Sequence, residues 1–442
     1  MMRDRRLAGL LVAGAVAMTA ALDVRAEPAS PRVEEVVSPG GIKAYLLHEP
    51  MLPFLSLSLH FKGGAALDPA GKEGLAWMLS GLLDEGAGEL DSQAFRTELE
   101  DKAIRLSFDA GRDEFTGQLR TLTEHRERAF ELLGLALSEP RFDDEPVERI
   151  RSQVQADLRR RSEDPDYISS LTWFETAFPD HPYGRPVRGT VESVAEIGTA
   201  DLERFVQDRL VKDQLTVGVA GDVTAEELGP LLDQAFGALP ESGQPIEVAT
   251  TEPAVAGTIV VRKPLPQSQV MFGEGGLPRD DPDYYAAYVA NHILGGGGFT
   301  SRLTDEVREK RGLAYSVYSY LYPNDFAPLW LGGAGTDSTR VGESIEIIKA
   351  EIARIAAGEV TQEELDDAKT YLTGSFPLRL TSNDRIAGML VGMQVHDLGP
   401  DYIDRRNELI EAVTLDDVRR VAGRLYDPEA LLTVVVGDPA GS

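Results

Sequence analysis

The sequence predicts an α+β protein built from two similar α/β units. Segments with the two-residue repeat of a strand alternate with segments that have the 3.6-residue repeat of a helix. The same order of strands and helices occurs twice, in residues 33–238 and in residues 258–440. A repeated order of elements indicates that one unit was duplicated.

The first half is expected to hold a sheet with helices between its strands. Phe54–Phe61, FLSLSLHF, alternates strictly and is interpreted as a central strand. The other predicted strands are the pair within Val33–His48, then Ile104–Ala110, Glu114–Thr121 and Gln214–Ala220. The predicted helices are Gly74–Leu83, Ser92–Lys102, Arg126–Ala136, Asp144–Arg161, Leu171–Phe178 and Thr224–Phe236.

A linker is expected over residues 239–257, which are rich in proline, glycine, threonine and glutamate and show little periodicity. The second half then repeats the order of the first. Its predicted strands are Gly257–Arg262, Gln267–Gly275, Leu313–Tyr320, Trp330–Gly335 and Leu431–Val436. Its predicted helices are Asp281–Leu294, a helix with Leu303 and Val307 on its apolar stripe, Arg340–Ala357, Thr361–Thr373, Tyr402–Val413 and Leu415–Leu425.

The most informative stretch is Gly295–Tyr320, which opens with four glycines. Thr300 or Ser301 can cap a helix that begins there, and Gly312 can end it in a left-handed conformation. The alternating residues that follow predict a strand. Arg308 is then in the last turn of the helix and Tyr315 near the start of the strand. A guanidinium and a phenol brought together at such a corner suit a peptide carbonyl or a developing oxyanion.

This stretch, with its glycine run, SRL and VREKRGLAYSV, resembles the C-terminal half of the pitrilysin/insulinase peptidases, the inverzincins. The resemblance extends from about residue 33 to residue 440. It implies that each unit is a mixed, mainly antiparallel sheet covered by helices, and that the units face each other like a clam shell. It also implies that Arg308 and Tyr315 bind substrate opposite a zinc site. From residue types alone, Arg308 could instead pair with Asp305 or Glu306 while Tyr315 belongs to the core.

The zinc half of the site is replaced. In catalytic members of this family the first helix carries H-x-x-E-H, two zinc ligands with a glutamate base between them. The resemblance puts Trp77, Ser80 and Gly81 at those positions, and it puts Asp157 at the position of the distal glutamate ligand. We therefore expect this chain to bind no metal and the zinc to belong to a partner subunit.

Other chemistries have less support in the sequence. Six histidines occur, but no two are spaced three or four residues apart, and His60 and His292 are the two whose surroundings matter most. The absence of cysteine excludes disulfides and thiolate zinc sites. No G-x-S-x-G or P-loop pattern is present. The segment His181–Thr190, HPYGRPVRGT, is interpreted as a structural turn fixed by two prolines.

The net charge of −29 argues against nucleic acid and anionic lipid as partners. Met1–Ala26 has the pattern of a secretory signal, with arginines first, then the mostly apolar run Leu7–Leu22, and small residues at Val24 and Ala26. An uncleaved anchor is the alternative, but the run is shorter than the roughly 20 residues that a span needs. We predict cleavage, no membrane span in the mature chain, and a periplasmic or secreted location.

These features predict a non-zinc subunit of a periplasmic heterodimeric zinc metallopeptidase that acts on unfolded peptides, inactive alone. Its partner would be a zinc-bearing homologous subunit. Leu106–Ala110 is the candidate sheet edge for adding an extended substrate. One alternative is a peptidase-like scaffold or peptide-binding protein with no part in hydrolysis, and another is an independent enzyme with a rebuilt metal site.

Overall fold

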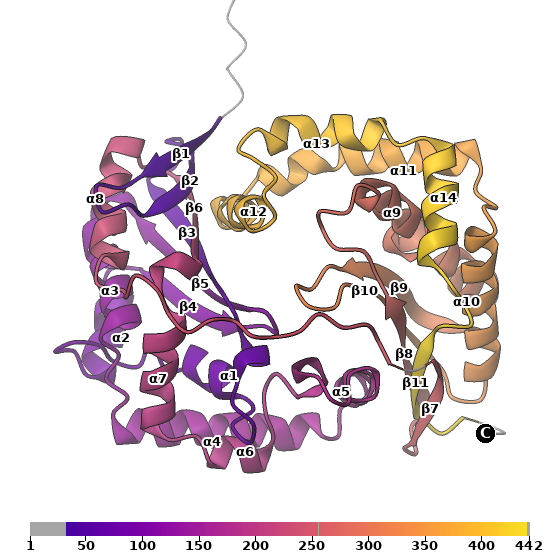
Figure 1. Cartoon of the computed structure of the whole chain (residues 1–442), viewed down its shortest axis with the longest axis horizontal. Helices are drawn as coiled ribbons and strands as arrows, with labels where there is room; N and C mark the ends of the chain where they lie inside the picture. Colours follow the sequence, from indigo (N-terminus) through magenta and orange to yellow (C-terminus); the bar gives the residue numbers. More distant parts are fainter. Residues whose placement is uncertain (1–31, 255, 440–442) are drawn as a thin grey trace, which may run out of the picture.

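The computed structural model describes residues 32–254 and 256–439, so the predicted signal segment lies outside the described residues. A six-stranded sheet forms in the first half of the chain and a five-stranded sheet in the second. Figure 1 shows the two halves as lobes that face each other. The predicted fold class, two α/β units arranged as a clam shell, is confirmed.

The first lobe has a mixed sheet with strand order β1-β2-β6-β3-β5-β4. The β2–β6 pair is parallel and the other pairs are antiparallel. Its elements are β1 (Val33–Val37), β2 (Lys43–His48), β3 (Phe54–Lys62), α1 (Leu75–Ser80), α2 (Ser92–Asp101), β4 (Arg105–Ala110), β5 (Glu114–Leu122), α3 (Arg126–Ser138), α4 (Asp144–Arg161), α5 (Pro165–Ala177), α6 (Val191–Ala195), α7 (Thr199–Arg209), β6 (Leu215–Gly221) and α8 (Ala225–Phe236).

The second lobe has the strand order β7-β11-β8-β10-β9, in which β7 and β11 are parallel. Its elements are β7 (Gly257–Arg262), β8 (Gln267–Gly275), α9 (Tyr284–Asn291), the π-helical turn Thr304–Glu309, β9 (Ala314–Tyr322), β10 (Leu329–Asp337), α10 (Val341–Ala356), α11 (Gln362–Gly374), α12 (Asn383–Val395), α13 (Tyr402–Glu411), α14 (Leu415–Leu425) and β11 (Leu432–Gly437). None of the helices in residues 32–254 and 256–439 is both long and apolar enough to cross a bilayer.

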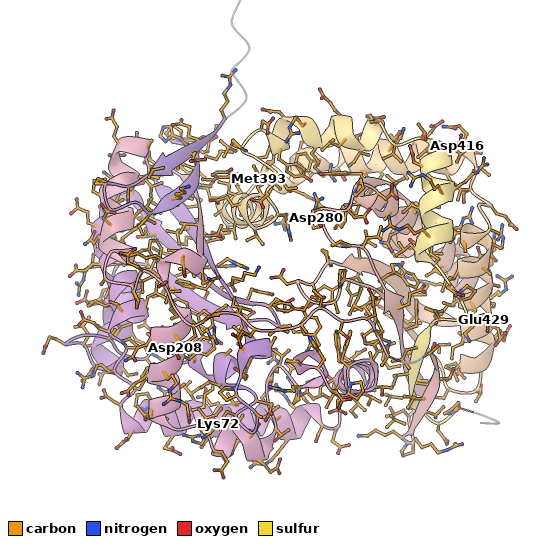
Figure 2. All side chains as sticks on the ribbon, in the orientation of Figure 1. Lys72, Asp208, Asp280, Met393, Asp416 and Glu429 are labelled. Atoms are coloured by element: carbon orange, nitrogen blue, oxygen red, sulfur yellow. The ribbon has the colours of Figure 1, made fainter. Side chains whose placement is uncertain are left out.

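The two lobes exchange one helix each. Helix α5 belongs to the first half of the chain, yet its Trp173 and Phe174 pack on the second sheet, and the Trp173 indole donates to the Leu432 carbonyl at 3.0 Å. Helix α12 belongs to the second half, yet it packs on the first sheet in a cluster that joins Leu390 and Met393 to strands β2 and β6. Figure 2 shows Met393 on α12 between the lobes. Each inner sheet face is therefore covered by the other half of the chain.

Two sequence expectations need correction. The predicted helix Gly74–Leu83 is shorter, because α1 ends at Ser80 and Gly81 caps it before a series of turns. No element was predicted for residues 383–395, which form α12. Two glycines among its apolar residues, Gly388 and Gly392, weaken the helical pattern of this segment, and the segment gains its stability from packing on the first sheet.

Gly218 of β6 marks the closest approach of α12 to the first sheet. A Cβ at Gly218 would lie 2.4 Å from the Ala387 carbonyl oxygen of α12, whereas a Cβ at Gly392 on the same helix meets no atom within 4 Å. We expect Gly218→Ala to lower the free energy of unfolding by about 1–3 kcal/mol through overpacking. Gly392→Ala is the matched control and should be neutral or stabilising by up to about 1 kcal/mol. Equal thermal midpoints for the two variants would contradict this packing.

Glu274 of β8 gives the stability a pH dependence. Its carboxylate is 6% exposed and accepts from the Asp427 backbone N–H at 3.1 Å, and burial raises its pKa to about 8. A folded-state pKa above the unfolded value means that the native state binds more protons, so stability falls as pH rises from about 4.5 to about 8. Glu274→Gln keeps an acceptor and should remove this fall, giving a gain of roughly 2–5 kcal/mol at pH 8.5. Thermal unfolding of both proteins at pH 5 and pH 8.5 measures it, and parallel pH profiles would refute it.

Candidate functional site, a closed metal position and an exposed arginine–tyrosine pair

Helix α1, which holds the degenerate metal positions, begins at a buried carboxylate. Asp68 accepts from the backbone N–H groups of Gly74, Leu75 and Ala76 at 2.8, 3.1 and 3.0 Å. These are N–H groups that the first turn of a helix cannot satisfy itself. Burial raises the pKa of Asp68 to about 7, although the three N–H groups favour its charged form. This carboxylate fixes where α1 starts and therefore where its side chains point.

Trp77, Ser80 and Gly81 share one face of this helix region, because residues three and four apart are neighbours on a helix. The Ser80 hydroxyl donates to the Trp77 carbonyl at 2.8 Å, so it is engaged by its own helix. Gly81 is the C-cap residue and has no side chain. None of the three offers the imidazole or carboxylate that zinc takes in such sites.

Arg188 occupies the space next to these positions. Its guanidinium lies 3.5 Å from the centre of the Trp77 ring, and its Nη1 lies 3.5 Å from Asp157 Oδ2. Asp157 also pairs with Arg160 through Oδ1 and with Arg161 at 2.6 Å through Oδ2. The structure thus brings together the predicted positions Trp77 and Asp157, with an arginine between them.

Arg188 reaches this place because two backbone segments cross closely beside the start of α1. A Cβ at Gly189 would lie 2.0 Å from the Glu73 carbonyl oxygen, and a Cβ at Gly74 would lie 2.6 Å from the Arg188 carbonyl oxygen. Both glycines have positive φ, 72° and 92°. Since only glycine fits this crossing, the residue before Gly189 is held at the helix start.

The sequence interpretation of His181–Thr190 was therefore incomplete. The segment makes a turn, with a 3-10 turn at Pro182–Gly184, but it also delivers Arg188 to the metal position. A basic residue next to a glycine was the signal available in the sequence. Its significance depends on Trp77, more than one hundred residues earlier in the chain, and no local pattern connects the two.

The residues at this position do not fit a zinc ion. Burial raises the pKa of Asp157, but hydrogen bonds from Arg161 and Arg160 outweigh burial and lower it, so the carboxylate is charged and already paired. Arg188 covers the Trp77 face, and burial together with Arg161 lowers the Arg188 pKa from its very high ordinary value. Across the described ranges no group of three or more His, Asp or Glu residues is placed to hold a metal. A fixed guanidinium cation stands where the resemblance implies a metal cation.

Arg308 and Tyr315 lie together on the other lobe. The Arg308 guanidinium carbon is 5.7 Å from the centre of the Tyr315 ring and 4.7 Å from that of Phe299. Tyr315 is 78% exposed and Phe299 is 70% exposed, so neither ring belongs to the core. Arg308 makes an ion pair with Glu309 at 3.4 Å, not with Asp305 or Glu306. The predicted pair is thus brought together and open to solvent, as a cation enclosed by two aromatic rings.

The local backbone explains how this pair forms. Leu303 and Val307 are fully buried and anchor the turn Thr304–Glu309. Gly312 has φ of 59° and its N–H donates to the Arg308 carbonyl at 2.8 Å, which ends the turn as predicted. Tyr315 then lies in a β-bulge, because the pairing with β10 slips between Gly335 and Thr336. A bulge redirects one side chain out of the alternation, and here it exposes Tyr315 beside Arg308.

Strands β4 and β9 are the last strands of their sheets. Strand β4 lies at the end of the first sheet, so the predicted edge Leu106–Ala110 is an edge strand. Strand β9 lies at the end of the second sheet, but Thr304 and Asn291 side chains already donate to two of its carbonyls, those of Val317 and Ser319. On this strand Tyr318 stacks on Tyr320, and Tyr320 meets Tyr322 edge to face, each pair with ring centres 6.2 Å apart. Burial raises the pKa of Tyr320 to about 12, so these phenols are neutral at physiological pH.

The two histidines singled out from the sequence have different surroundings. His292 stacks on Tyr371 with ring centres 5.1 Å apart, and burial lowers its pKa. His60 lines a pocket between the lobes together with His396. Neither lies in the group around Trp77 or in the group around Arg308.

Comparisons with known proteins agree with this geometry. The family model described as insulinase, peptidase family M16, matches residues 43–191, and the model described as the peptidase M16 inactive domain matches residues 196–372. The chain is 31% identical over 341 residues to the non-peptidase homolog YmxG of Helicobacter pylori, which covers 77% of this chain and 78% of that protein. It is 24% identical over 438 residues to a probable mitochondrial-processing peptidase subunit beta of Schizosaccharomyces pombe, covering 94% of this chain and 93% of that protein.

A solved structure, the peptidase M16 inactive domain from Pseudomonas fluorescens, has a TM-score of 0.87 and 28% sequence identity, and the match covers 93% of this chain and 98% of that one. This chain therefore shares its fold with that solved relative. Within this fold it has the repeated sheets, the exchanged helices and the replaced metal positions described above. The protein belongs to peptidase family M16, the insulinase family.

Proposed function

We propose that this chain is the non-zinc subunit of a two-chain metallopeptidase that cleaves unfolded peptides, and that it works in the periplasm or outside the cell. The observation that carries the proposal is the solvent-exposed Arg308–Tyr315 pair, kept in a chain whose metal position is closed by Arg188. A pure scaffold has no need to hold an arginine between two exposed aromatic rings.

The division of labour follows from the chemistry. The partner would supply zinc, which activates water and polarises the carbonyl. On this chain Arg308 would donate to the peptide carbonyl, and Tyr315 would add a phenolic donor beside it. The edge strand β4 would hold the substrate in an extended conformation through backbone hydrogen bonds.

Relatives support the proposal in two ways. One is named a non-peptidase homolog, and another is named as one subunit of a mitochondrial-processing peptidase. The location rests on the arginines and the apolar run within residues 1–26. A peptide-binding scaffold is the competing function, favoured by the arginine that closes the metal position.

Reconstitution separates the two functions. The mature chain should show no hydrolysis of a quenched fluorescent peptide when alone, and it should form a stable complex with an H-x-x-E-H homologue from the same organism. Mixing should raise the activity of that homologue at least 100-fold. A chain that stays unassociated at micromolar concentration and leaves the homologue's rate unchanged would favour the scaffold.

A further inference from the structure

A pocket of about 320 Å³ lies where the two lobes and the exchanged helix α12 meet. The first lobe contributes His60 from β3 and Asp113 and Glu114 from the start of β5. The second lobe contributes 322–325, the end of β9 and the loop that follows it, and α12 contributes residues between 388 and 396. The pocket is separate from the group around Arg308 and from the closed metal position.

Three polar atoms of this pocket have no hydrogen-bond partner within the described residues: His60 Nδ1, Asp113 Oδ1 and Asn324 Nδ2. Asp113 is only 7% exposed and Asn324 only 9%. An unpaired buried polar atom costs about 1–3 kcal/mol. The part of the chain that the structure describes has five buried side-chain polar atoms without a hydrogen-bond partner, and three of them lie in this one pocket. A bound ligand that hydrogen-bonds to these three atoms would explain why they are grouped here.

The second carboxylate oxygen of Asp113, Oδ2, accepts two hydrogen bonds, and these fix the orientation of the side chain. Its Oδ2 accepts from the Tyr183 hydroxyl at 2.5 Å and from the Asp325 backbone N–H at 3.0 Å. The neighbouring Arg112 acts on Asp113 through its charge but makes no direct ion pair with it, because its guanidinium donates to the Tyr183 carbonyl and lies 3.9 Å from the centre of the Phe174 ring. Asp113 Oδ1 is therefore a fixed and unpaired acceptor.

The charges around the pocket favour a cation. Three carboxylates, Asp113, Glu114 and Asp325, line the pocket, and its described lining includes no Lys or Arg. The cations beyond the lining are Lys62, which lies 3.4 Å from Asp325, Arg112 beside Asp113, and Arg279, which acts on His396. Burial lowers the pKa of both His60 and His396, so the imidazoles are mainly neutral at pH 7. Burial also raises the pKa of Asp113 and Glu114, which means that it destabilises their charged carboxylates. A bound cation would stabilise these charged forms.

The remaining wall is apolar and contains Pro323, Val391 and Val395. We propose that the pocket binds a small aliphatic amine: its ammonium donates to Asp113 Oδ1, its carbon chain packs on the valines, and a hydroxyl or carbonyl oxygen accepts from Asn324 Nδ2. A metal ion is disfavoured, since no three His, Asp or Glu side chains in residues 32–254 and 256–439 are placed to hold one. Because its contacts come from both lobes and α12, the amine would hold the lobes together.

The test uses 4-aminobutan-1-ol, which has an ammonium group, a four-carbon chain and a hydroxyl. We expect one saturable site per mature chain by isothermal titration calorimetry and a thermal midpoint that rises with its concentration. Butane-1,4-diol, which is uncharged, and 4-hydroxybutyrate, which is an anion, should bind at least tenfold more weakly. No saturable heat, or equal binding of the three compounds, would overturn the proposal.

Two variants locate the site. Asp113→Asn should weaken binding at least tenfold, while Asp109→Asn, on the exposed face of the neighbouring strand β4, should not change it. If Asp113→Asn unfolds, Gly392→Leu still tests the pocket, because its new side chain starts in open space at the pocket wall and should block the ligand. Wild-type affinity in Gly392→Leu would show that the amine binds elsewhere and would overturn the assignment.

Discussion

Arg308→Ala is expected to lower kcat/KM of the proposed two-chain peptidase, once reconstituted, about 100- to 1,000-fold, the effect of removing one oxyanion donor from a peptidase. Arg308 is held in place by Phe299, Tyr315 and Glu309, so its guanidinium is oriented before any substrate arrives. Preorganised donors are the ones whose loss costs most, because no reorganisation energy is spent during the reaction. Steady-state hydrolysis of a quenched fluorescent peptide measures the loss.

Arg311→Ala is the matched control for this prediction. Arg311 follows the same turn and pairs with Glu306, away from Tyr315. Its removal should leave kcat/KM within about twofold of wild type, as expected for an exposed ion pair. Tyr315→Phe should cost about tenfold, since it keeps the ring and removes one donor. Equal losses for Arg308→Ala and Arg311→Ala, with intact complexes, would exclude a special role for the pair.

Restoring the metal ligands should fail while Arg188 is present. We expect the variant Trp77→His, Ser80→Glu, Gly81→His, Asp157→Glu to bind no stoichiometric zinc, because the Arg188 guanidinium lies on the site. Adding Arg188→Ala to it should allow one zinc per chain with micromolar affinity or better, about 8 kcal/mol or more of binding free energy. A side chain at position 81 is sterically acceptable, since its Cβ would lie 3.4 Å from Ile150 Cγ2.

Zinc content after dialysis, measured by mass spectrometry of the metal, decides this prediction. Arg188→Ala alone is the control, and it should bind no zinc because Trp77, Ser80 and Gly81 still lack ligands. Stoichiometric zinc in the variant that keeps Arg188 would show that the arginine does not close the position. Failure of both restored variants, although folded, would place the obstruction elsewhere in α1.

Much of the fold followed from local patterns. Strict alternation identified β3, and glycine at position 312 identified the corner between the turn Thr304–Glu309 and β9. Arg308 and Tyr315 could be paired because only seven residues and one left-handed glycine separate them. The bulge that exposes Tyr315 was not predictable, since it depends on the register with β10.

The sequence by itself determined the two repeated units and the arginine–tyrosine corner, and its resemblance to the family assigned Trp77, Ser80 and Gly81 to the zinc positions. These depend on residue types and short spacings along one segment. Only the tertiary structure decided that α5 and α12 change lobes, that Arg188 lies on Trp77 beside Asp157, and that His60, Asp113 and Asn324 share one pocket. The physical reason is that an apolar stripe or a charge specifies what kind of neighbour a residue needs, but not which distant segment supplies it.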